Sequence, residues 1–492
     1  MAVRSFIVVG AGVGGLATAL RLAHLGHRVT VLEKTDQVGG RNRELKVGAA
    51  TFDGGPSLMM MLAPFRKLYR DVGERLEDHL DLVQCDPNYR VWFGDSTTID
   101  ATPNMARMLP QIEALAGPEE AARYPAFLGK LAELYHESMP NFVQRNYDSP
   151  LDLVRPRSAV IALRHGMLGN LAKGVSRWFR DERLRQLFCL QSMYLGLSPF
   201  DAPWVYATLA YMEYGEGIWY PRGGMVNIAL SIAALAEARG AEIRLNAPVR
   251  AISGKRVELE SGEVLEADGV ICNADLPYAE RCLLGDAPHP CPSPPEGRGV
   301  SKRRYSCSAF MMYLDYRGGT GLLHHNILLG KEFFDNLDQI FNRKEIPDDP
   351  AFYVNVTSRT DPEKAASGGE NIFILVPCPN LDHPWTEADG CALQEKIFTR
   401  LEKEVGFDRD RIATMRTLTP QDWASDLNLD KGAAFGLSHD FFQSVCFRPS
   451  NRSKAHPGLY FVGASTVPGN GLPMVLIGAE LVEERLRKDG LL

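Results

Sequence analysis

The chain has 492 residues, of which 45% are hydrophobic and 23% charged, so it can bury a substantial core. Its net charge of −7 at pH 7 argues against a nucleic-acid partner. No apolar run is long enough to span a membrane and no secretory signal is visible. Nine cysteines without a C-x-x-C spacing indicate reduced thiols and a cytoplasmic protein.

The N-terminal residues predict a strand, a glycine turn and a helix. An apolar stretch at residues 5–9 runs into Gly10-Ala11-Gly12-Val13-Gly14-Gly15. Gly10, Gly12 and Gly15 have the G-x-G-x-x-G spacing of a dinucleotide site, where glycines allow a tight turn and close approach of a pyrophosphate. Amides at the start of the helix then face the phosphates. This pattern predicts a Rossmann-type α/β domain.

The second predicted strand, residues 27–32, ends in Glu33-Lys34. A carboxylate at this position can accept hydrogen bonds from both ribose hydroxyls, which favours an unphosphorylated adenosine ribose.

The next segment favours FAD over NAD. An NAD domain continues with more strand–helix units, whereas this chain continues with Gly39-Gly40-Arg41 and then with residues 51–57, Thr-Phe-Asp-Gly-Gly-Pro-Ser. The glycines let the chain fold back over a diphosphate, and Arg41 supplies a charge-assisted hydrogen bond to it.

The central region contains a helix at residues 225–239, strands at 242–245, 249–252 and 257–259, and an apolar strand at 269–272 that ends in Asn273-Ala274-Asp275. We expect the strand near Val249 to present its backbone to the adenine. The proline-rich segment 286–304 predicts a loop.

The C-terminal region supplies a second glycine turn. A buried strand at residues 458–462 leads through Gly463-Ala464-Ser465-Thr466 and Gly471-Leu472-Pro473-Met474 into a helical run to Leu486. A helix N-terminus there suits the flavin pyrimidine edge, where negative charge gathers on reduction.

The two separated halves of one nucleotide site predict a discontinuous FAD-binding domain at residues 1–60, 222–277 and 445–492. Residues 61–221 and 278–444 then form an inserted α+β substrate domain, with one nucleotide cofactor and no NADPH site. The residues expected to bind FAD are Val9, Gly10, Ala11, Gly12, Val13, Gly14, Gly15, Glu33, Lys34, Gly40, Arg41, Gly55, Pro56, Ser57, Val249, Asn273, Ala274, Gly463, Ala464, Gly471, Pro473 and Met474.

Three motifs together resemble bacterial carotenoid desaturases of the phytoene desaturase type. They are Trp219-Tyr220-Pro221-Arg222-Gly223-Gly224-Met225, the loop Asp53-Gly54-Gly55-Pro56, and the turn Gly463-Ala464-Ser465-Thr466. Tyr305-Ser306-Cys307-Ser308-Ala309-Phe310, with Gln191, Tyr194 and Leu195, resembles the dehydrosqualene (diapophytoene) desaturases. Val467 and Asn470 depart from the pattern, because many members have histidine and alanine there.

The resemblance implies a glutathione-reductase-like FAD domain of the amine-oxidase and phytoene-desaturase superfamily. It also implies the removal of hydrogen from CH2–CH2 units of a linear polyene, dehydrosqualene or phytoene. The protein mainly supplies orientation and a dry site, so no catalytic side chain is named. Asp152, Glu213 and Glu216 are more readily structural or surface acids, and His324-His325 has no third ligand at metal spacing, so no metal is expected.

Three alternatives remain. The first is an amine oxidase, which would share this cofactor frame. Many amine oxidases tether flavin through a C-terminal cysteine, however, and no cysteine follows Cys446. A carotenoid oxygenase or isomerase would share the superfamily, and Val467 and Asn470 lie where reactivity could be tuned. A non-catalytic lipid-carrying protein of the Rab-escort type could keep the fold, although the intact cofactor motif argues against it.

An apolar substrate of this kind resides in the bilayer, so we expect peripheral association with the inner face of the cell membrane. Residues 151–190 are the expected membrane-facing part, because eight basic residues between Arg155 and Arg185 are interleaved with apolar ones. With one nucleotide site, electrons are expected to leave to a quinone or to oxygen.

Overall fold

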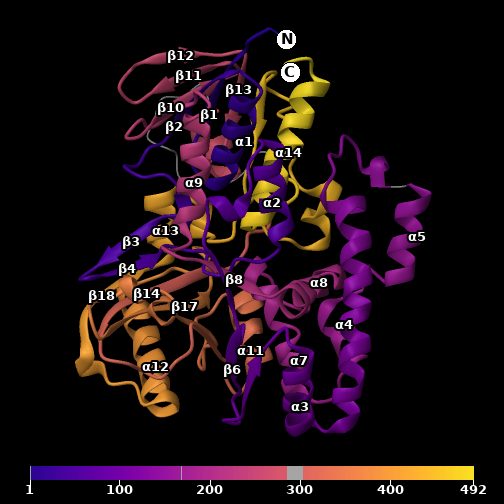
Figure 1. The fold of residues 1–492 in the computed structure, drawn as a ribbon, viewed down its shortest axis with the longest axis vertical. Coiled ribbons are helices and arrows are strands. Elements are labelled where there is room, and N and C mark those ends of the chain that lie inside the picture. The colour runs from indigo at the N-terminus through magenta and orange to yellow at the C-terminus, as the bar shows by residue number, and fades with distance from the viewer. Residues whose placement is uncertain (1, 154, 168, 285–302) are drawn as a thin grey trace.

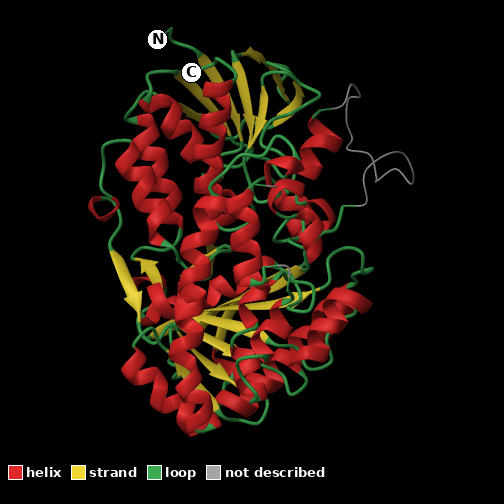
Figure 2. Cartoon of the chain, turned by 90° about the vertical axis from the view of Figure 1, so that its right-hand side faces the viewer, coloured by secondary structure: helices red, strands yellow, loops and turns green. Residues whose placement is uncertain are grey.

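The computed structural model describes residues 2–153, 155–167, 169–284 and 303–492. Most of the segment 286–304, predicted as a loop, lies outside these residues. Within the described ranges, no helix is both long and apolar enough to cross a membrane. Two sheets lie at opposite ends of an elongated molecule, and both chain termini are at the same end (Figures 1 and 2).

The first sheet carries the predicted dinucleotide motif. Its five strands are parallel, in the order β19-β13-β1-β2-β9, and consist mostly of buried apolar residues, as expected for a parallel sheet covered on both faces. The strands are β1 (Ser5–Val9), β2 (Arg28–Leu32), β9 (Glu242–Arg244), β13 (Gly269–Cys272) and β19 (Leu459–Phe461).

Alternation along these strands directs neighbouring side chains to opposite faces. Phe6 and Val8 pack against helices on one face, whereas Ile7 and Val9 pack against a three-stranded antiparallel sheet on the other. The helices are α1 (Val13–His24), α2 (Leu62–Asp71), α9 (Val226–Glu237) and α14 (Leu472–Lys488), and the small sheet consists of β10 (Val249–Ser253), β11 (Arg256–Leu259) and β12 (Val264–Glu266).

The second sheet has seven strands in the order β18-β14-β17-β16-β15-β6-β7 and is antiparallel except for the pair β15–β6. The helix α12 (Glu387–Val405) covers one face. The strands are β6 (Tyr89–Trp92), β7 (Thr98–Ala101), β14 (Ser308–Arg317), β15 (His325–Leu328), β16 (Phe352–Val356), β17 (Gly369–Cys378) and β18 (Ile412–Leu418).

Helices beside this sheet complete the second region (Figure 1). The longer ones are α3 (Met105–Ala116) and α4 (Pro118–Ser138), which pack against α5 (Pro156–His165), α6 (Leu171–Ser176), α7 (Glu182–Leu187) and α8 (Thr208–Tyr211) around an apolar core. A two-stranded pair, β5 (Leu82–Cys85) with β8 (Ile218–Pro221), joins the two regions.

Two segments lie on the other side of the expected domain boundaries. Although residues 61–80 were expected in the substrate domain, α2 packs into the core of the first sheet through Phe65 and Leu68. Conversely, the hairpin of β3 (Glu44–Val47) and β4 (Ala50–Asp53) packs on the second sheet, where Phe52 contacts Tyr313 edge-on at 5.5 Å. The apolar side chains of α2 recur at helix spacing and those of β4 alternate, which indicates a buried face but not the sheet on which it packs.

The basic residues between Arg155 and Arg185 are spread along α4 (Pro118–Ser138). Arg164 is paired with Glu137 at 2.9 Å near the C-terminal end of α4, whereas the Arg180 amide donates to Glu120 at 3.0 Å near its N-terminal end. At 1.5 Å per residue these two ends are about 25 Å apart. The described residues of the range 151–190 are therefore largely helical, and they reach from one end of α4 to the other.

The expectation of reduced thiols is only partly met. Among the described residues, seven cysteines are free and Cys282 is disulfide-bonded. The lack of a C-x-x-C spacing does not exclude pairing between cysteines that are further apart.

Candidate functional site

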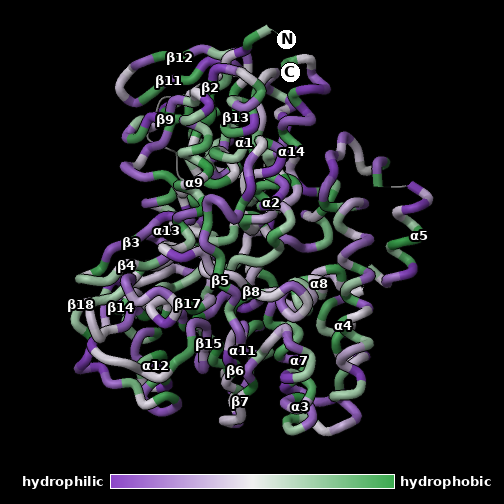
Figure 3. Tube along the Cα trace, in the orientation of Figure 1, coloured by the Kyte–Doolittle hydropathy of each residue, from purple (hydrophilic) through white to green (hydrophobic). Residues whose placement is uncertain are grey.

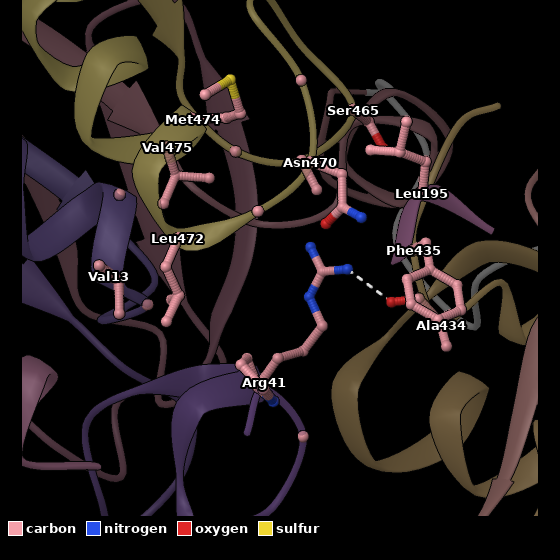
Figure 4. A pocket seen from close by; sticks show the side chains of 18 of the residues that line it. Val13, Arg41, Leu195, Ala434, Phe435, Ser465, Asn470, Leu472, Met474 and Val475 are labelled. Atoms are coloured by element: carbon pink, nitrogen blue, oxygen red, sulfur yellow. Dashed lines mark hydrogen bonds between the residues drawn. The ribbon is translucent and has the colours of Figure 1, made fainter. Parts of the chain in front are cut away.

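A single continuous cavity of about 590 Å³ extends from the first sheet into the second region. Every residue expected to bind FAD lines it except Ala11 and Gly15, which lie within the turn itself. Figure 4 shows its central part, where Arg41 points toward the loop of Ala434 and Phe435, and Asn470 and Ser465 lie across from it.

The glycine turn has the geometry that a pyrophosphate requires. Gly10 has a φ of +97° and its amide donates to Leu32 O at 2.7 Å. A Cβ atom on Gly12 would lie 2.7 Å from Asn273 Oδ1, and one on Gly15 would lie 2.3 Å from Gly10 O. Because no side chain fits at these positions, the turn leaves an open cradle beside the start of α1, and its residues fit a bound dinucleotide.

Glu33 is buried directly after β2, and its side chain is hydrogen-bonded to the glycine turn. Its Oε2 accepts from the Ala11 amide at 2.8 Å, and its Oε1 accepts from the Thr35 amide at 3.0 Å and from the Thr35 hydroxyl at 2.9 Å. The sequence alone predicts only the ribose contact. Each carboxylate oxygen has more than one acceptor site, and Glu33 also lines the cavity, so both roles are compatible.

Arg41 lies in the short helix η1 (Gly40–Asn42) and reaches across the cavity. Its Nη1 donates to Ala434 O at 2.7 Å (Figure 4). Burial lowers the pKa of Arg41, and the Asp275 carboxylate opposes that shift. The same charge interaction opposes the burial that raises the pKa of Asp275. Part of the guanidinium fork stays free for an anionic group on the cavity side.

Two of the motifs singled out in the sequence meet in space. Asp53 Oδ1 accepts from the Met225 amide at 2.7 Å, and Asn42 Nδ2 donates to Met225 O at the same distance. The loop Asp53-Gly54-Gly55-Pro56 is thereby tied to the turn before α9. Burial raises the pKa of Asp53 from 3.8 to about 7.

Arg448 holds the C-terminal turn, a role that is not apparent from the sequence. It is 3% exposed and donates to five main-chain carbonyls, two of which belong to Ala464 and Thr466. Burial lowers its pKa to about 10. Nothing in the sequence around Arg448 distinguishes it from a surface arginine, because its partners are main-chain atoms.

The turn of Val467 and Asn470 departs from the family pattern. His439, from another segment of the chain, lies beside this turn. Val467 is buried, and the Asn470 side chain donates to Tyr194 O at 3.2 Å. The Asn470 amide donates to Nε2 of His439 at 3.0 Å, and His439 lines the cavity. Burial lowers the pKa of His439 well below 6.5, so this imidazole is neutral near pH 7.

The half of the cavity away from the first sheet is lined by apolar and aromatic side chains. Among its described lining residues there is no aspartate, glutamate, lysine or arginine, and His439 is neutral. Representative residues are Met60, Met139, Phe142, Leu190, Met193, Tyr194, Tyr206, Leu209, Met212, Ile327, Leu329, Phe352 and Tyr353.

Of the three acids considered in the sequence analysis, Glu213 alone is fully buried. Its Oε2 accepts from the Tyr89 hydroxyl at 2.8 Å and from Gln191 Nε2 at 2.9 Å. The Tyr194 hydroxyl also lies against its carboxyl, directly behind the cavity wall. Burial raises the pKa of Glu213 from 4.5 to about 7. Asp152 and Glu216 remain partly exposed.

Comparison with known proteins agrees with this geometry. Residues 13–474 match a family described as flavin containing amine oxidoreductase. The chain is 43% identical to a zeta-carotene-forming phytoene desaturase of Myxococcus xanthus, over 98% of this chain and 94% of that protein. It is 38% identical to a phytoene desaturase of Neurospora crassa over 99% and 85%, and 32% identical to a 4,4'-diapophytoene desaturase of Staphylococcus haemolyticus over 98% of each.

Solved structures share the fold at low sequence identity. An oxidoreductase from Methanosarcina mazei superposes with a TM-score of 0.63 at 18% identity, over 98% of this chain and all of that one. A putrescine oxidase superposes with a TM-score of 0.62 at 15% identity, over 99% of each chain.

Proposed function

The chain belongs to the flavin-containing amine oxidoreductase family and is an FAD-dependent oxidoreductase, and we propose that it desaturates a linear polyene of the phytoene type. The predicted resemblance to carotenoid desaturases is confirmed by relatives at 32–43% identity. Phytoene is favoured over its thirty-carbon analogue because the phytoene desaturases compared above are more similar to this chain than the diapophytoene desaturase is.

The uncharged half of the cavity is the observation that carries this proposal. An amine substrate is a cation near neutral pH, and burying it without a counter-ion costs several kcal/mol. The described lining of this half offers neither a carboxylate nor a charged histidine, so it suits a hydrocarbon better than an amine. A hydrocarbon chain also gains about 0.8 kcal/mol for each CH2 group that leaves water.

When bound, FAD supplies an acceptor for hydrogen removed from a saturated CH2–CH2 unit. The protein contributes the position of the reacting carbons. Tyr194 and Asn470 bridge the apolar half to the C-terminal turn, so a chain lying along Met193 and Leu209 runs toward the cofactor half. The same apolar wall excludes water, and binding and orientation are the main catalytic contributions.

The test is co-expression with phytoene synthase or with dehydrosqualene synthase in a host that makes no carotenoids. We expect conjugated products from phytoene, and less product from the thirty-carbon substrate. A folded, yellow protein that leaves phytoene unchanged would rule out this function.

We further propose that α5 and the short helices beside it dock on a membrane. Leu151, Val160, Leu163, Phe442 and Phe447 are 77%, 63%, 78%, 70% and 44% exposed. They belong to η4 (Pro150–Leu153), α5, η14 (Phe441–Gln443) and η15 (Val445–Phe447), and η15 contacts η4. Along α5, hydrophobic and hydrophilic residues are mixed at the outer edge of the molecule (Figure 3).

The cavity reaches this same region. Met167 and Val445 line the cavity, and in the chain they lie four residues from Leu163 and two residues from Phe447. Arg155 and Arg157 are exposed beside it, and a basic residue near an anionic surface contributes about 1 kcal/mol. An apolar substrate could therefore pass between bilayer and cavity without crossing water.

The double variant Val160→Glu with Leu163→Glu tests the docking surface. We expect much less protein to sediment with anionic liposomes, with FAD content unchanged. Leu230→Glu is the matched control, because Leu230 is 48% exposed on α9, in the other region. Equal sedimentation of the double variant and the parent would reject this surface.

With a single glycine-rich dinucleotide turn among the described residues, we propose that electrons leave to a membrane quinone or to oxygen. Anaerobic turnover should then require an added quinone. Anaerobic turnover supported by NADP alone would contradict this proposal.

A further inference from the structure

A second cluster of potential ligands lies outside the FAD and polyene sites. The Cys85 sulfur and one nitrogen each of His324 and His325 lie within 4.8 Å of one another. All three residues are more than nine-tenths buried. In the sequence the histidine pair has no third ligand at metal spacing. The fold brings Cys85, the last residue of β5, beside the start of β15.

Both imidazoles have one nitrogen occupied and the other free. Nδ1 of His324 is 2.6 Å from the Thr360 hydroxyl. Nδ1 of His325 is 2.7 Å from the Tyr353 hydroxyl and 3.1 Å from the Asn355 side-chain amide nitrogen. Nε2 of each ring is buried without a hydrogen-bond partner. A buried polar atom without a partner costs free energy, so two such atoms beside a thiol call for a ligand.

The arrangement around the rings is that of a metal site. Metal-binding histidines typically use one nitrogen for a hydrogen bond that fixes the ring, which leaves the other nitrogen for the ion. Thr360 and Tyr353 supply these hydrogen bonds. Tyr220 packs edge-on against His324 with ring centroids 4.9 Å apart, and its hydroxyl donates to Asp361 at 3.3 Å. The Asp361 carboxylate thus contacts Tyr220, which in turn contacts the cluster.

We propose that Cys85, His324 and His325 form a zinc(II) site with a structural role. One thiolate and two imidazoles are ligands that zinc prefers, and a fourth position remains for water or a neighbouring hydroxyl. Zinc–ligand bonds of about 2.0–2.3 Å would require the three atoms to move closer by about 1 Å, which small side-chain rotations allow. The Cys85 thiol releases its proton to solvent on binding, and no redox step is involved.

Zinc at this place would join two parts of the molecule. Cys85 belongs to the β5–β8 pair, and His325 belongs to the seven-stranded sheet, where it pairs with Asn355. Tyr353, which holds His325, also lines the cavity. Metal binding would therefore fix one cavity wall, independently of whether the substrate is phytoene.

The test uses the purified FAD-loaded protein, dialysed against zinc and then against metal-free buffer. We expect stoichiometric zinc by elemental mass spectrometry, and background zinc in Cys85→Ala and His325→Gln. Cys307→Ala is the matched control, because Cys307 is 2% exposed and lies outside the cluster. Tyr353→Phe keeps all three ligands and should weaken zinc binding about ten- to hundredfold.

A second measurement does not depend on the folding of any variant. X-ray absorption at the zinc edge of the parent should show one sulfur and two imidazole nitrogens. A zinc shell without sulfur, parent protein without zinc, or equal zinc in Cys85→Ala would each overturn the proposal. None of these results depends on desaturase activity, so failure here is distinguishable from failure of the proposed function.

Discussion

The two ends of the cavity have different walls: main chain at one end and apolar side chains at the other. At the first sheet, the wall consists of main chain at Gly10, Gly12 and Gly463. An added Cβ at Gly12 would lie 2.7 Å from Asn273 Oδ1, and Gly10 and Gly463 have φ angles of +97° and +150°, which side chains disfavour. At the second region, the wall consists of apolar side chains such as Met193 and Leu209, with polar groups one layer behind. A diphosphate needs fixed amides that nothing can replace, whereas a hydrocarbon needs only volume and dryness.

The largest effect should come from placing a side chain in the main-chain wall. A valine at Gly12 would bring its Cβ to 2.7 Å from Asn273 Oδ1 and fill the space for the pyrophosphate. Overpacking of this kind costs about 3 kcal/mol, or about a hundredfold in affinity. We expect Gly12→Val to be folded and colourless, as judged by circular dichroism and flavin absorbance.

Gly129→Val is the control for this prediction. Gly129 lies in α4 with no heavy atom near the position of an added Cβ. Its variant should keep the flavin spectrum of the parent. An unchanged flavin spectrum in folded Gly12→Val would show that the main-chain wall tolerates side chains after all.

The second effect concerns the polar layer behind the apolar wall, which consists of Glu213, Tyr89 and Gln191. The pKa of Glu213 is raised by burial from 4.5 to about 7, so the folded state binds more protons than the unfolded state between these values. The stability due to this group is therefore complete below about pH 4.5 and is lost as the pH rises through about 7, at a total of about 3 kcal/mol.

Glu213→Gln removes this pH dependence while keeping the hydrogen bonds from Tyr89 and Gln191. We expect the variant to equal the parent near pH 5 and to exceed it by up to about 3 kcal/mol at pH 8, measured as chemical denaturation at both values. The pKa of Asp53 is also raised to about 7, but Asp53 is present in both proteins. Its contribution to the pH dependence of the unfolding free energy is therefore the same in both. Parallel stability curves would show that Glu213 is already ionised in the folded protein.

The difference between the two ends also explains how much could be predicted from the sequence. The signals of the first sheet are local: Gly10 to Gly15 and Glu33 lie within one strand–helix–strand unit, and the predicted strands differ from the observed ones by a residue or two. Family resemblance added the function. The polar layer is not local, because Glu213 meets Tyr89, and Cys85 meets His324, only after the second region has packed. The basic residues from Arg155 to Arg185 are close in sequence, yet Arg164 and Arg180 lie near opposite ends of α4.

Arg41 belongs to the cofactor end but is bonded to Ala434 in the loop beyond it, so it tests whether the two ends are independent. A charge-assisted hydrogen bond contributes about 1.5–3 kcal/mol, and the lower value applies because part of the guanidinium is already engaged. We therefore expect Arg41→Ala to weaken FAD binding about tenfold, measured by titration of the FAD-free protein. Arg43→Ala is the matched control, because Arg43 faces a half-exposed Asp426 at 3.7 Å and does not line the cavity. Equal affinity in the two variants would remove Arg41 from the diphosphate site. If turnover at saturating FAD falls as well, the bond to Ala434 also positions the apolar wall, and the two ends act as one site.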